Sequence, residues 1–174
     1  MTRKIHDTDY LFLTTHVRAL EGCLLNRGQM EQMLEAGSPE EAARILTDCG
    51  YPELETVSAI TVGEMLTKER ERLFQDLAEL VPDPAILAVF QLPHDYHNVK
   101  VLLKSEAMGI QEDRLLVDAG RIPSKQLAAA LRSGEVQNLP PQLGEAIDEA
   151  RQVLSATRDP QLGDMVLDRC YFQE

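Results

Sequence analysis

The sequence predicts an all-α protein, a helical bundle built of a repeated helical unit. Apolar residues recur at intervals of three and four along most of the chain, which places them on one face of a helix. No segment alternates between apolar and polar residues as a half-buried strand does. Trp is absent and aromatic residues make up only 5% of the chain, so the core has to be built mainly from Leu, Ala, Val, Ile and Met.

Two helices are expected before Gly37. The first begins near Asp7 or Thr8, and its apolar residues are spaced three and four apart as on one side of a helix. This stripe consists of Tyr10, Leu13, Val17, Leu20 and Leu24. The second helix is short, from about Gln29 to Ala36, because glycine is a typical residue just beyond a helix end.

Capping patterns predict the starts of the next two helices. Ser38 is expected to be the N-cap of the third helix, with Pro39 at the first helical position and Glu41 closing a capping box. A second capping box at residues 61–64 is expected to open a long helix that reaches about Leu80. The inward face of that helix is predicted to consist of Val62, Leu66, Leu73, Leu77 and Leu80.

Prolines are expected to divide the middle of the chain. Asp83 and Pro84 start a short helix that ends at Phe90, and Pro93 opens a separate helix that ends at Gly109. Proline fits the first turn of a helix because its missing N–H group has no intrahelical partner there. The buried face of the second of these helices is predicted to consist of Tyr96, Val99, Leu103 and Ala107.

Three further helices complete the prediction. One follows Pro123, one covers about residues 142–156, and the last is capped by Asp159 and begins at Pro160. Their inward residues are predicted to be Leu127, Ala128, Leu131, Leu143, Ile147, Ala150, Leu154, Leu162, Val166 and Cys170. No stop signal follows in the last helix, so the chain is expected to be a fragment of a longer protein, cut inside a helix.

Residues 24–46 and 102–131 resemble each other. Each stretch has an apolar helix end, a short helix closing in Ala-Gly, a proline and a helix rich in Ala and Leu. Duplication predicts this pattern, and so does the shared composition of helical sequences. The expected organisation is a first helical domain over residues 1–92 and a second helical region over residues 93–174, truncated in its last helix.

Charge and composition exclude several classes of function. The net charge is −12, which repels nucleic acids and anionic membrane surfaces and keeps a helical protein soluble. No stretch approaches the roughly 20 apolar residues of a membrane span, and the N-terminus lacks the apolar run of a signal peptide. Three widely spaced cysteines, Cys23, Cys49 and Cys170, indicate neither a disulfide framework nor a zinc motif. These observations predict a soluble, cytoplasmic protein.

The one cluster of possible metal ligands is His94, Asp95 and His97. Two histidines three apart on a helix lack a third placed ligand, so the preferred interpretation is a helix first turn with Asp95 near the positive end of the dipole. The chain has no nucleophile elbow, phosphate-binding loop or dinucleotide fingerprint. We therefore expect no catalytic, cofactor-binding or metal residues and no cofactor, and the interface residues are unassigned.

Four segments carry a resemblance to a known family. VRALEG at residues 17–22, followed by two leucines, resembles the opening helix of the C subunit of V-type (A-type) ATPases and ATP synthases, which is related to the d subunit of the vacuolar ATPase. DYHNVKVLLK at residues 95–104 and LVDAGRIP at residues 116–123 are similar to further hallmarks of that family. DPQLGDMVLDRCYF at residues 159–172 resembles the stretch where the family begins its next domain. The chain matches the N-terminal half of the family.

The resemblance implies a non-enzymatic part of a rotary motor. Members of this family consist of three similar helical domains that form a funnel on the membrane rotor ring. The funnel receives the central shaft and couples ATP synthesis or hydrolysis to proton or sodium transport. The expected partners are therefore the central shaft and the rotor ring, and the expected location is cytoplasmic and peripheral to the membrane through that ring.

Two other functions compete with this hypothesis. A general helical adaptor would bind peptide segments outside any rotary ATPase. An enzyme would need a metal and a pocket that joins His94 and His97 to further acids. Because half of the family's length is missing, the fragment is also expected to expose apolar surface and to self-associate. The sequence does not identify the transported ion or the direction in which the machine runs.

Overall fold

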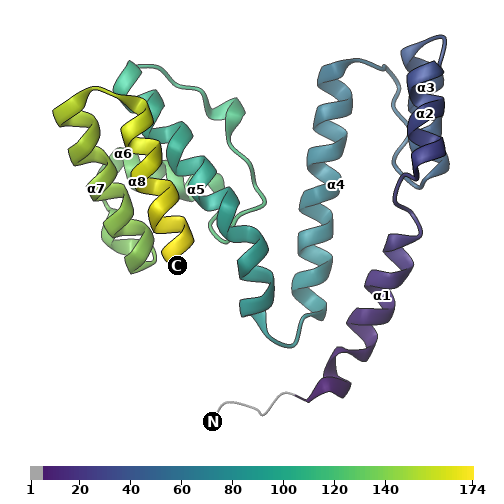
Figure 1. The fold of residues 1–174 in the computed structure, drawn as a ribbon, viewed down its shortest axis with the longest axis horizontal. Coiled ribbons are helices and arrows are strands. Elements are labelled where there is room, and N and C mark those ends of the chain that lie inside the picture. Colours follow the sequence, from purple (N-terminus) through teal and green to yellow (C-terminus); the bar gives the residue numbers. More distant parts are fainter. Residues whose placement is uncertain (1–5) are drawn as a thin grey trace. The chain divides into compact units, whose positions relative to one another are not determined.

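The computed structural model describes residues 6–174, and these are helical with no β-strand, which confirms the all-α prediction. They divide into two compact units, the first ending at Pro84 and the second spanning Ala85–Glu174. The first unit contains a 3-10 turn, η1 (Asp7–Tyr10), and four helices, α1 (Leu11–Glu21), α2 (Arg27–Glu35), α3 (Pro39–Asp48) and α4 (Ala59–Leu80) (Figure 1).

The first helix is shorter than the sequence predicts. α1 ends at Glu21, so Leu24 lies beyond it and 66% of that residue is exposed. The physical reason lies in the next helix. Asn26 caps α2, with its Oδ1 accepting from the Gln29 N–H at 3.0 Å and the Gln29 side chain accepting from the Asn26 N–H at 2.9 Å. This reciprocal capping box starts α2 at Arg27, two residues earlier than expected.

Ser38 is the N-cap of α3, as predicted. Its hydroxyl oxygen accepts from the Glu41 N–H at 3.2 Å, and Pro39 occupies the first helical position. The capping box is incomplete, however. The Glu41 carboxylate accepts from the N–H of Gly37 at 2.8 Å and not from that of Ser38, so it holds the turn one residue before the cap.

The predicted start of α4 is wrong. Ser58 is the N-cap, and the box is formed with Thr61, whose hydroxyl accepts from the Ser58 N–H at 2.9 Å. The Ser58 hydroxyl accepts in return from the Thr61 N–H at 3.1 Å. Thr61 is thus the third helical residue, because its hydroxyl serves the earlier cap. The helix gains most of an extra turn, and Gly63 moves from the predicted first turn into the helix interior.

We expect Gly63→Ala to stabilise the protein by about 0.5–1 kcal/mol, because alanine loses less backbone entropy in a helix interior. A Cβ atom at Gly63 would have nothing within 4 Å. The matched control is Gly50→Ala. A Cβ there is equally unhindered, but φ of +94° makes the substitution unfavourable. Urea unfolding followed by circular dichroism measures both, and a destabilised Gly63→Ala variant would contradict the placement of the helix.

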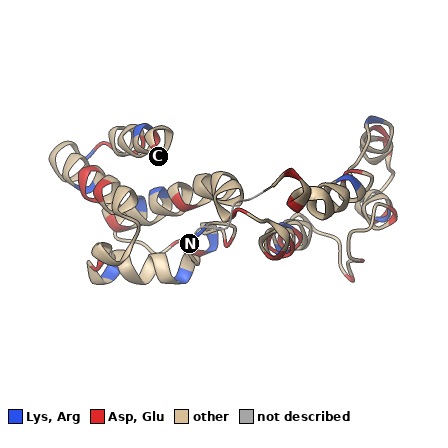
Figure 2. Ribbon diagram, turned by 90° about the horizontal axis from the view of Figure 1, so that it is seen from below, with Lys and Arg blue, Asp and Glu red and all other residues tan. Residues whose placement is uncertain are grey.

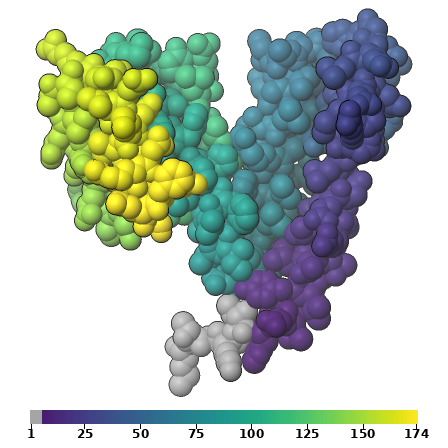
Figure 3. Space-filling model, in the orientation of Figure 1, coloured from purple at the N-terminus to yellow at the C-terminus, as the bar shows by residue number. Residues whose placement is uncertain are grey.

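Packing in the first unit is thin. Its described buried apolar residues are Leu46 and Met65. Leu66 and Leu73, which were predicted to face inward, remain 43% and 39% exposed. Figure 3 shows α1, α2 and α3 in purple to blue on the visible face. Much of the apolar surface that the helical pattern assigns to a core therefore faces solvent here.

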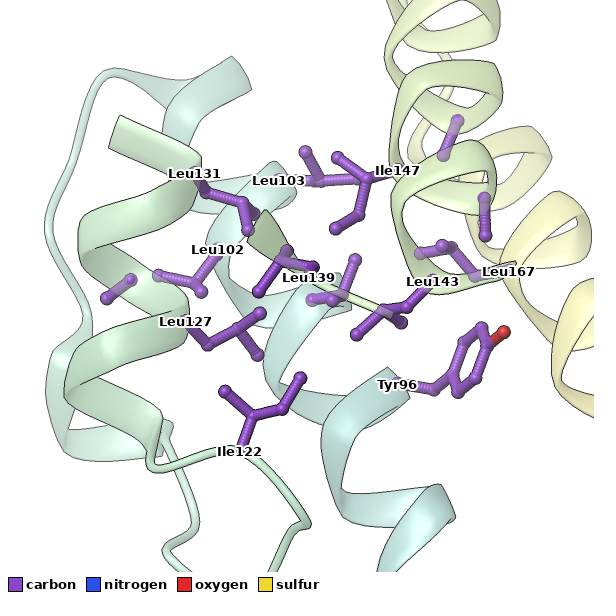
Figure 4. Close-up of a cluster of buried hydrophobic side chains, with 14 residues drawn as sticks. Tyr96, Leu102, Leu103, Ile122, Leu127, Leu131, Leu139, Leu143, Ile147 and Leu167 are labelled. Carbon is purple, nitrogen blue, oxygen red and sulfur yellow. The ribbon is translucent and has the colours of Figure 1, made fainter. Parts of the chain in front are cut away.

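The second unit has a continuous core. It contains α5 (Pro84–Met108), η2 (Asp113–Leu115), α6 (Ser124–Ser133), η3 (Val136–Asn138), α7 (Pro141–Thr157) and α8 (Pro160–Gln173). Figure 4 shows the side chains from α5, α6 and α7 converging, with Leu167 of α8 beside them. The labelled core residues are Tyr96, Leu102, Leu103, Ile122, Leu127, Leu131, Leu139, Leu143, Ile147 and Leu167. Of the residues predicted to face inward, Ala107 and Leu162 are exposed.

The predicted break between Phe90 and Pro93 is wrong, because α5 continues through Pro93. A proline in a helix interior costs about 3 kcal/mol. Burial of one large apolar side chain offsets roughly 1.5–3 kcal/mol, and α5 buries several in the turns that follow. These include Tyr96, Val99, Leu102 and Leu103. Tertiary packing therefore outweighs the local preference of proline for the first turn.

Candidate functional site

The most unusual side chain of the second unit is Asp95, which is fully buried in α5. Its Oδ2 accepts from Nε of Arg121 at 2.7 Å, and its Oδ1 accepts from the Ile122 N–H at 3.2 Å. The adjacent Gly120 makes this approach possible, because a Cβ atom there would lie 2.2 Å from Asp95 Oδ1. The glycine is required by close contact and not by a left-handed backbone.

Arg121 continues the chain of contacts to α8. Its Nη1 donates to Oε1 of Glu174 at 2.6 Å, and the Tyr96 hydroxyl donates to the other carboxylate oxygen of Glu174 at 3.0 Å. We call Asp95, Tyr96, Arg121 and Glu174 the Asp95 network. It joins α5, the segment before α6 and the end of α8, three parts of the chain that lie far apart in sequence.

The electrostatics of the Asp95 network favour a structural role, in which the charged groups hold the helices together, over a role in proton transfer. Burial raises the pKa of Asp95, although Arg121 and the Ile122 N–H oppose that shift. Burial and the hydrogen bond to Glu174 raise the pKa of Tyr96, so its hydroxyl keeps its proton. Burial opposes the charge of Arg121, but its bonds to Glu174 and Asp95 prevail and raise its pKa. The guanidinium is therefore a permanent cation between two carboxylates.

A second pair of bonds ties α5 to the same segment. The buried Asn98 side chain donates from Nδ2 to the Val117 carbonyl and accepts at Oδ1 from the Val117 N–H, both at 2.8 Å. One residue later, Asp118 Oδ1 accepts from the Ser124 N–H at 2.8 Å, which satisfies a free donor at the start of α6. Asn98 thus provides hydrogen-bond partners for the backbone of the segment before α6, which has no secondary structure of its own at Val117.

We expect Asp118→Ala to cost about 1 kcal/mol at neutral pH, the usual loss when a helix start loses its side-chain acceptor. Hydrogen bonds from the side chain and backbone of Ser124 lower the pKa of Asp118 below its ordinary 3.8. A lowered pKa gives stability that is present above pH 3.8 and is lost as the pH falls through the folded-state value.

The free energy of unfolding of wild type should therefore exceed that of Asp118→Ala by the full amount at pH 7, and this difference should shrink below pH 3.8. Urea unfolding at several pH values measures it. Asp113→Ala serves as the control because Asp113 pairs with Arg132 at an exposed site, where an ion pair contributes little. A difference that stays constant down to acid pH would contradict the assigned bond.

Ion pairs also connect α5 to α8 and α7. Lys100 bonds Asp168 at 2.5 Å, and Lys104 bonds Asp164 at 2.6 Å, so two successive turns of α5 are paired with two turns of α8. Arg151 of α7 bonds Glu106 of α5 at 3.0 Å and also donates to the Leu131 carbonyl of α6. These partly exposed pairs add orientation more than stability.

The structure does not bring the predicted metal candidates together. Asp95 turns inward to Arg121, whereas the exposed His97 has its Nε2 3.1 Å from the Leu115 carbonyl oxygen, and His94 is half-buried. Over residues 6–174, no group of three or more His, Cys, Asp or Glu side chains is arranged to hold a metal ion. Sequence reasoning placed Asp95 at a helix start; it is in fact a buried ion-pair partner.

Three of the four segments that carried the family resemblance contact one another in the second unit. DYHNVKVLLK provides Asp95 and Asn98, and LVDAGRIP provides their partners Val117, Gly120 and Arg121. DPQLGDMVLDRCYF provides Asp164 and Asp168, the partners of the two α5 lysines. Sequence reasoning did not assign Arg121, Asn98 or Glu174 to a site. Arg121 could have been found from the sequence. It follows a glycine in one family segment, and another family segment carries an acidic residue, Asp95, on a helix.

Charged side chains are spread over both units. Figure 2 shows acidic and basic residues interspersed along the helices, without a large basic region. Residues 1–84 carry 16 acidic and 8 basic side chains, and residues 85–174 carry 13 and 9. In the described part of the chain, no helix is long and apolar enough to cross a membrane.

Comparison with known proteins identifies related sequences. The family model described as "ATP synthase (C/AC39) subunit" matches residues 13–174. The C subunit of the V-type sodium ATPase of Enterococcus hirae is 29% identical over 167 residues, covering 95% of this chain and 51% of that protein. The C subunit of the A-type ATP synthase of Methanocaldococcus jannaschii is 26% identical over 129 residues, covering 68% of this chain and 32% of that protein.

The chain thus spans about half or less of the length of these curated relatives. No solved structure matches it. The matched region includes all three of the segments that contact one another in the second unit.

Proposed function

The chain belongs to the ATP synthase (C/AC39) subunit family, and from that premise we propose that it is a non-catalytic part of the rotor of a V-type ATPase. In this role it links the central shaft to the membrane rotor ring and couples ATP synthesis or hydrolysis to the transport of protons or sodium ions. It acts as a stiff helical body that holds two partners, and ATP chemistry belongs to other parts of the complex.

One observation carries the proposal: the polar side chains of the family segments are used to hold the second unit together. Asp95, Asn98 and Arg121 make their hydrogen bonds to the protein itself, and the fully buried Asp95 offers no surface to a substrate. Such buried, paired groups favour one arrangement of the surrounding helices over others. Stiffness is the property that a torque-transmitting part requires.

The names of the relatives support the assignment of partners. Both are parts of ATPases or ATP synthases, one named for sodium. The proposed partners are the central shaft and the rotor ring, and the proposed location is peripheral to the membrane through that ring. Because the chain matches about half of each relative's length or less, these partners belong to the proposal.

The direct test is reconstitution. A rotary ATPase from which the C subunit has been removed is incorporated into vesicles, and this chain is added. We expect the chain to co-sediment with the vesicles and to bind the isolated shaft proteins. The variant Arg132→Met loses only an exposed ion pair, so it should bind as well as the wild-type chain and serves as a control for substitution in itself. The proposal would be contradicted if the chain did not bind the shaft, or if it did not bind the ring.

A second candidate function is a general helical adaptor. The exposed apolar residues of the first unit favour it, because they would suit many amphipathic helices. Capture from a membrane extract discriminates between the two. Recovery of rotary-ATPase components supports the rotor function, whereas recovery of unrelated proteins with none of these components supports the adaptor.

We also propose that the chain self-associates through its first unit. Leu34 is 86% exposed and Ile60 is 73% exposed, and both belong to helices with thin packing. Size-exclusion chromatography at several concentrations is expected to show an apparent mass that rises with concentration. The double variant Leu34→Gln/Ile60→Gln should weaken this rise. A strict monomer at all concentrations would contradict self-association.

A further inference from the structure

An open groove lies beside α4 in the first unit, and we call it the α1–α4 groove. Its volume is about 320 Å³, and its walls are the end of α1, the turns that follow α1 and α3, and the middle of α4. Leu20 and Leu24 line it from the side of α1, and Leu66 and Leu73 line it from α4. Three of these leucines, Leu24, Leu66 and Leu73, are exposed. The groove is therefore an apolar surface that no segment in the described part of the chain covers completely.

α4 presents a regular seam of side chains to the groove. Leu66, Arg70 and Leu73 are four and three residues apart, so they lie on one face of the helix. All three line the groove. This is the spacing with which one helix packs against a second helix. A partner helix laid along α4 would cover the two leucines and would meet Arg70 midway between them.

Arg70 is the polar residue of this seam, and its hydrogen bonding is incomplete. Its Nε is buried and has no hydrogen-bond partner. The two acids that line the groove are bonded elsewhere, because Arg72 Nη2 lies 2.7 Å from Glu69 Oε2 and Arg72 Nη1 lies 3.8 Å from Asp76 Oδ2. Arg70 forms no ion pair with any described residue. A buried donor without an acceptor is costly, so an occupant that supplies an acceptor here is favoured.

We propose that the α1–α4 groove binds an amphipathic helix of a partner protein, and that a carboxylate of that helix pairs with Arg70. The partner helix carries two large apolar residues seven apart, which pack against Leu66 and Leu73, and an Asp or Glu between them on the same face. A single polar residue within an apolar seam fixes the register of two helices. Arg70 therefore selects partners that carry the acid at this place.

Other occupants supply only part of what the groove lacks. A small apolar molecule would cover the leucines without giving Arg70 an acceptor. A second copy of the chain joined through Leu34 and Ile60 would leave the groove open, because neither residue lines it. A helix supplies both parts at once, since residues three, four and seven apart share one of its faces. The inference rests on the first unit alone and does not depend on the proposed rotor function.

The test uses the full chain and a synthetic probe. The probe is a fluorescently labelled, alanine-rich helical peptide with two leucines seven apart and a glutamate midway between them on the same face. A matched peptide carries glutamine in place of the glutamate. Fluorescence anisotropy measures the affinity of the chain for each peptide. We expect the glutamate peptide to bind about tenfold more tightly, because only its carboxylate forms a charge-assisted bond with Arg70.

Two variants of the chain locate the binding site. Arg70→Met should weaken binding of the glutamate peptide about tenfold and leave binding of the glutamine peptide unchanged. Leu66→Gln should weaken binding of both peptides, because it removes apolar contact that both of them make. The matched control is Arg27→Met, which loses only an exposed ion pair with Glu31 outside the groove and should bind both peptides like wild type. Circular dichroism confirms that each variant is folded.

Three results would overturn the proposal: binding of neither peptide, equal affinity of the chain for both peptides, or unchanged binding of the glutamate peptide in Arg70→Met. If neither peptide binds, two measurements identify the true occupant. Isothermal titration with decanoate, an apolar carboxylate, detects a small-molecule site. Size-exclusion chromatography of Leu66→Gln detects an interface between two copies of the chain, because that variant would then associate less than wild type.

Discussion

Gly120→Ala is expected to lower the free energy of unfolding of the second unit by about 3 kcal/mol, at the upper end of the cost of overpacking. The new methyl group would lie 2.2 Å from Oδ1 of Asp95 and 3.2 Å from its Cγ. The carboxylate has no room to retreat because Asp95 is fully buried in α5. Relieving the clash requires displacement of Asp95 from Arg121, which disturbs a buried ion pair. Urea unfolding followed by circular dichroism measures the loss.

A double-mutant cycle isolates the cause. In an Asp95→Ala background the clashing oxygen is gone, so Gly120→Ala is expected to cost little beyond the first substitution. The two changes are therefore strongly non-additive. An equal cost of Gly120→Ala in both backgrounds would show that the glycine is needed for its own backbone and not for its approach to Asp95.

Arg121→Met is expected to be destabilising by about 3–5 kcal/mol, because it leaves the buried Asp95 carboxylate without its partner. The loss exceeds the value of the bond itself, since the remaining charge is desolvated and uncompensated. The double variant Asp95→Asn/Arg121→Met removes both charges and should recover much of the loss. Arg132→Met is the control because its ion pair with Asp113 is exposed, and it should change stability by less than about 1 kcal/mol.

The pH dependence of Arg121→Met has a definite sign. Burial raises the pKa of Asp95 above its ordinary 3.8, and the loss of Arg121 removes a group that opposes that shift. A raised pKa gives stability that is present below pH 3.8 and is lost as the pH rises through the folded-state value. The variant should therefore regain stability on acidification from pH 7 toward about 4, measured relative to the double variant. A gap that widens on acidification would contradict this origin of the effect.

Helix type and spacing were predictable from the sequence, and helix starts were predictable only in part. Ser38 and Asp159 are N-caps as expected, because a short polar side chain before a proline leaves few alternatives. Ser58 was missed, since the pattern at residues 61–64 offered a competing cap with an acidic third residue. Which of two overlapping boxes forms depends on the partner of Thr61, and the sequence alone does not distinguish them.

The site was less predictable than the fold, because its bonds connect distant parts of the chain. Arg121 and Glu174 are fifty-three residues apart, and neither has a local pattern that points to the other. The resemblance located the segments that contain Asp95 and Arg121 without showing that they bond each other. Burial was also unpredictable for Leu66 and Leu73, because a helical stripe identifies a face without showing what covers it.

The proline in α5 has a mechanical consequence. Pro93 has no N–H to donate to the carbonyl one turn earlier, so α5 lacks one backbone hydrogen bond at this point. Ahead of it lie the solvent-facing Val89 and Phe90, and behind it lie the anchored Tyr96 and Val99. Amide protons on the leading side should therefore exchange with deuterium sooner than those on the trailing side. Of the turns of α5, we expect this one to bend most easily, so the stiffly packed part of the second unit begins after Pro93.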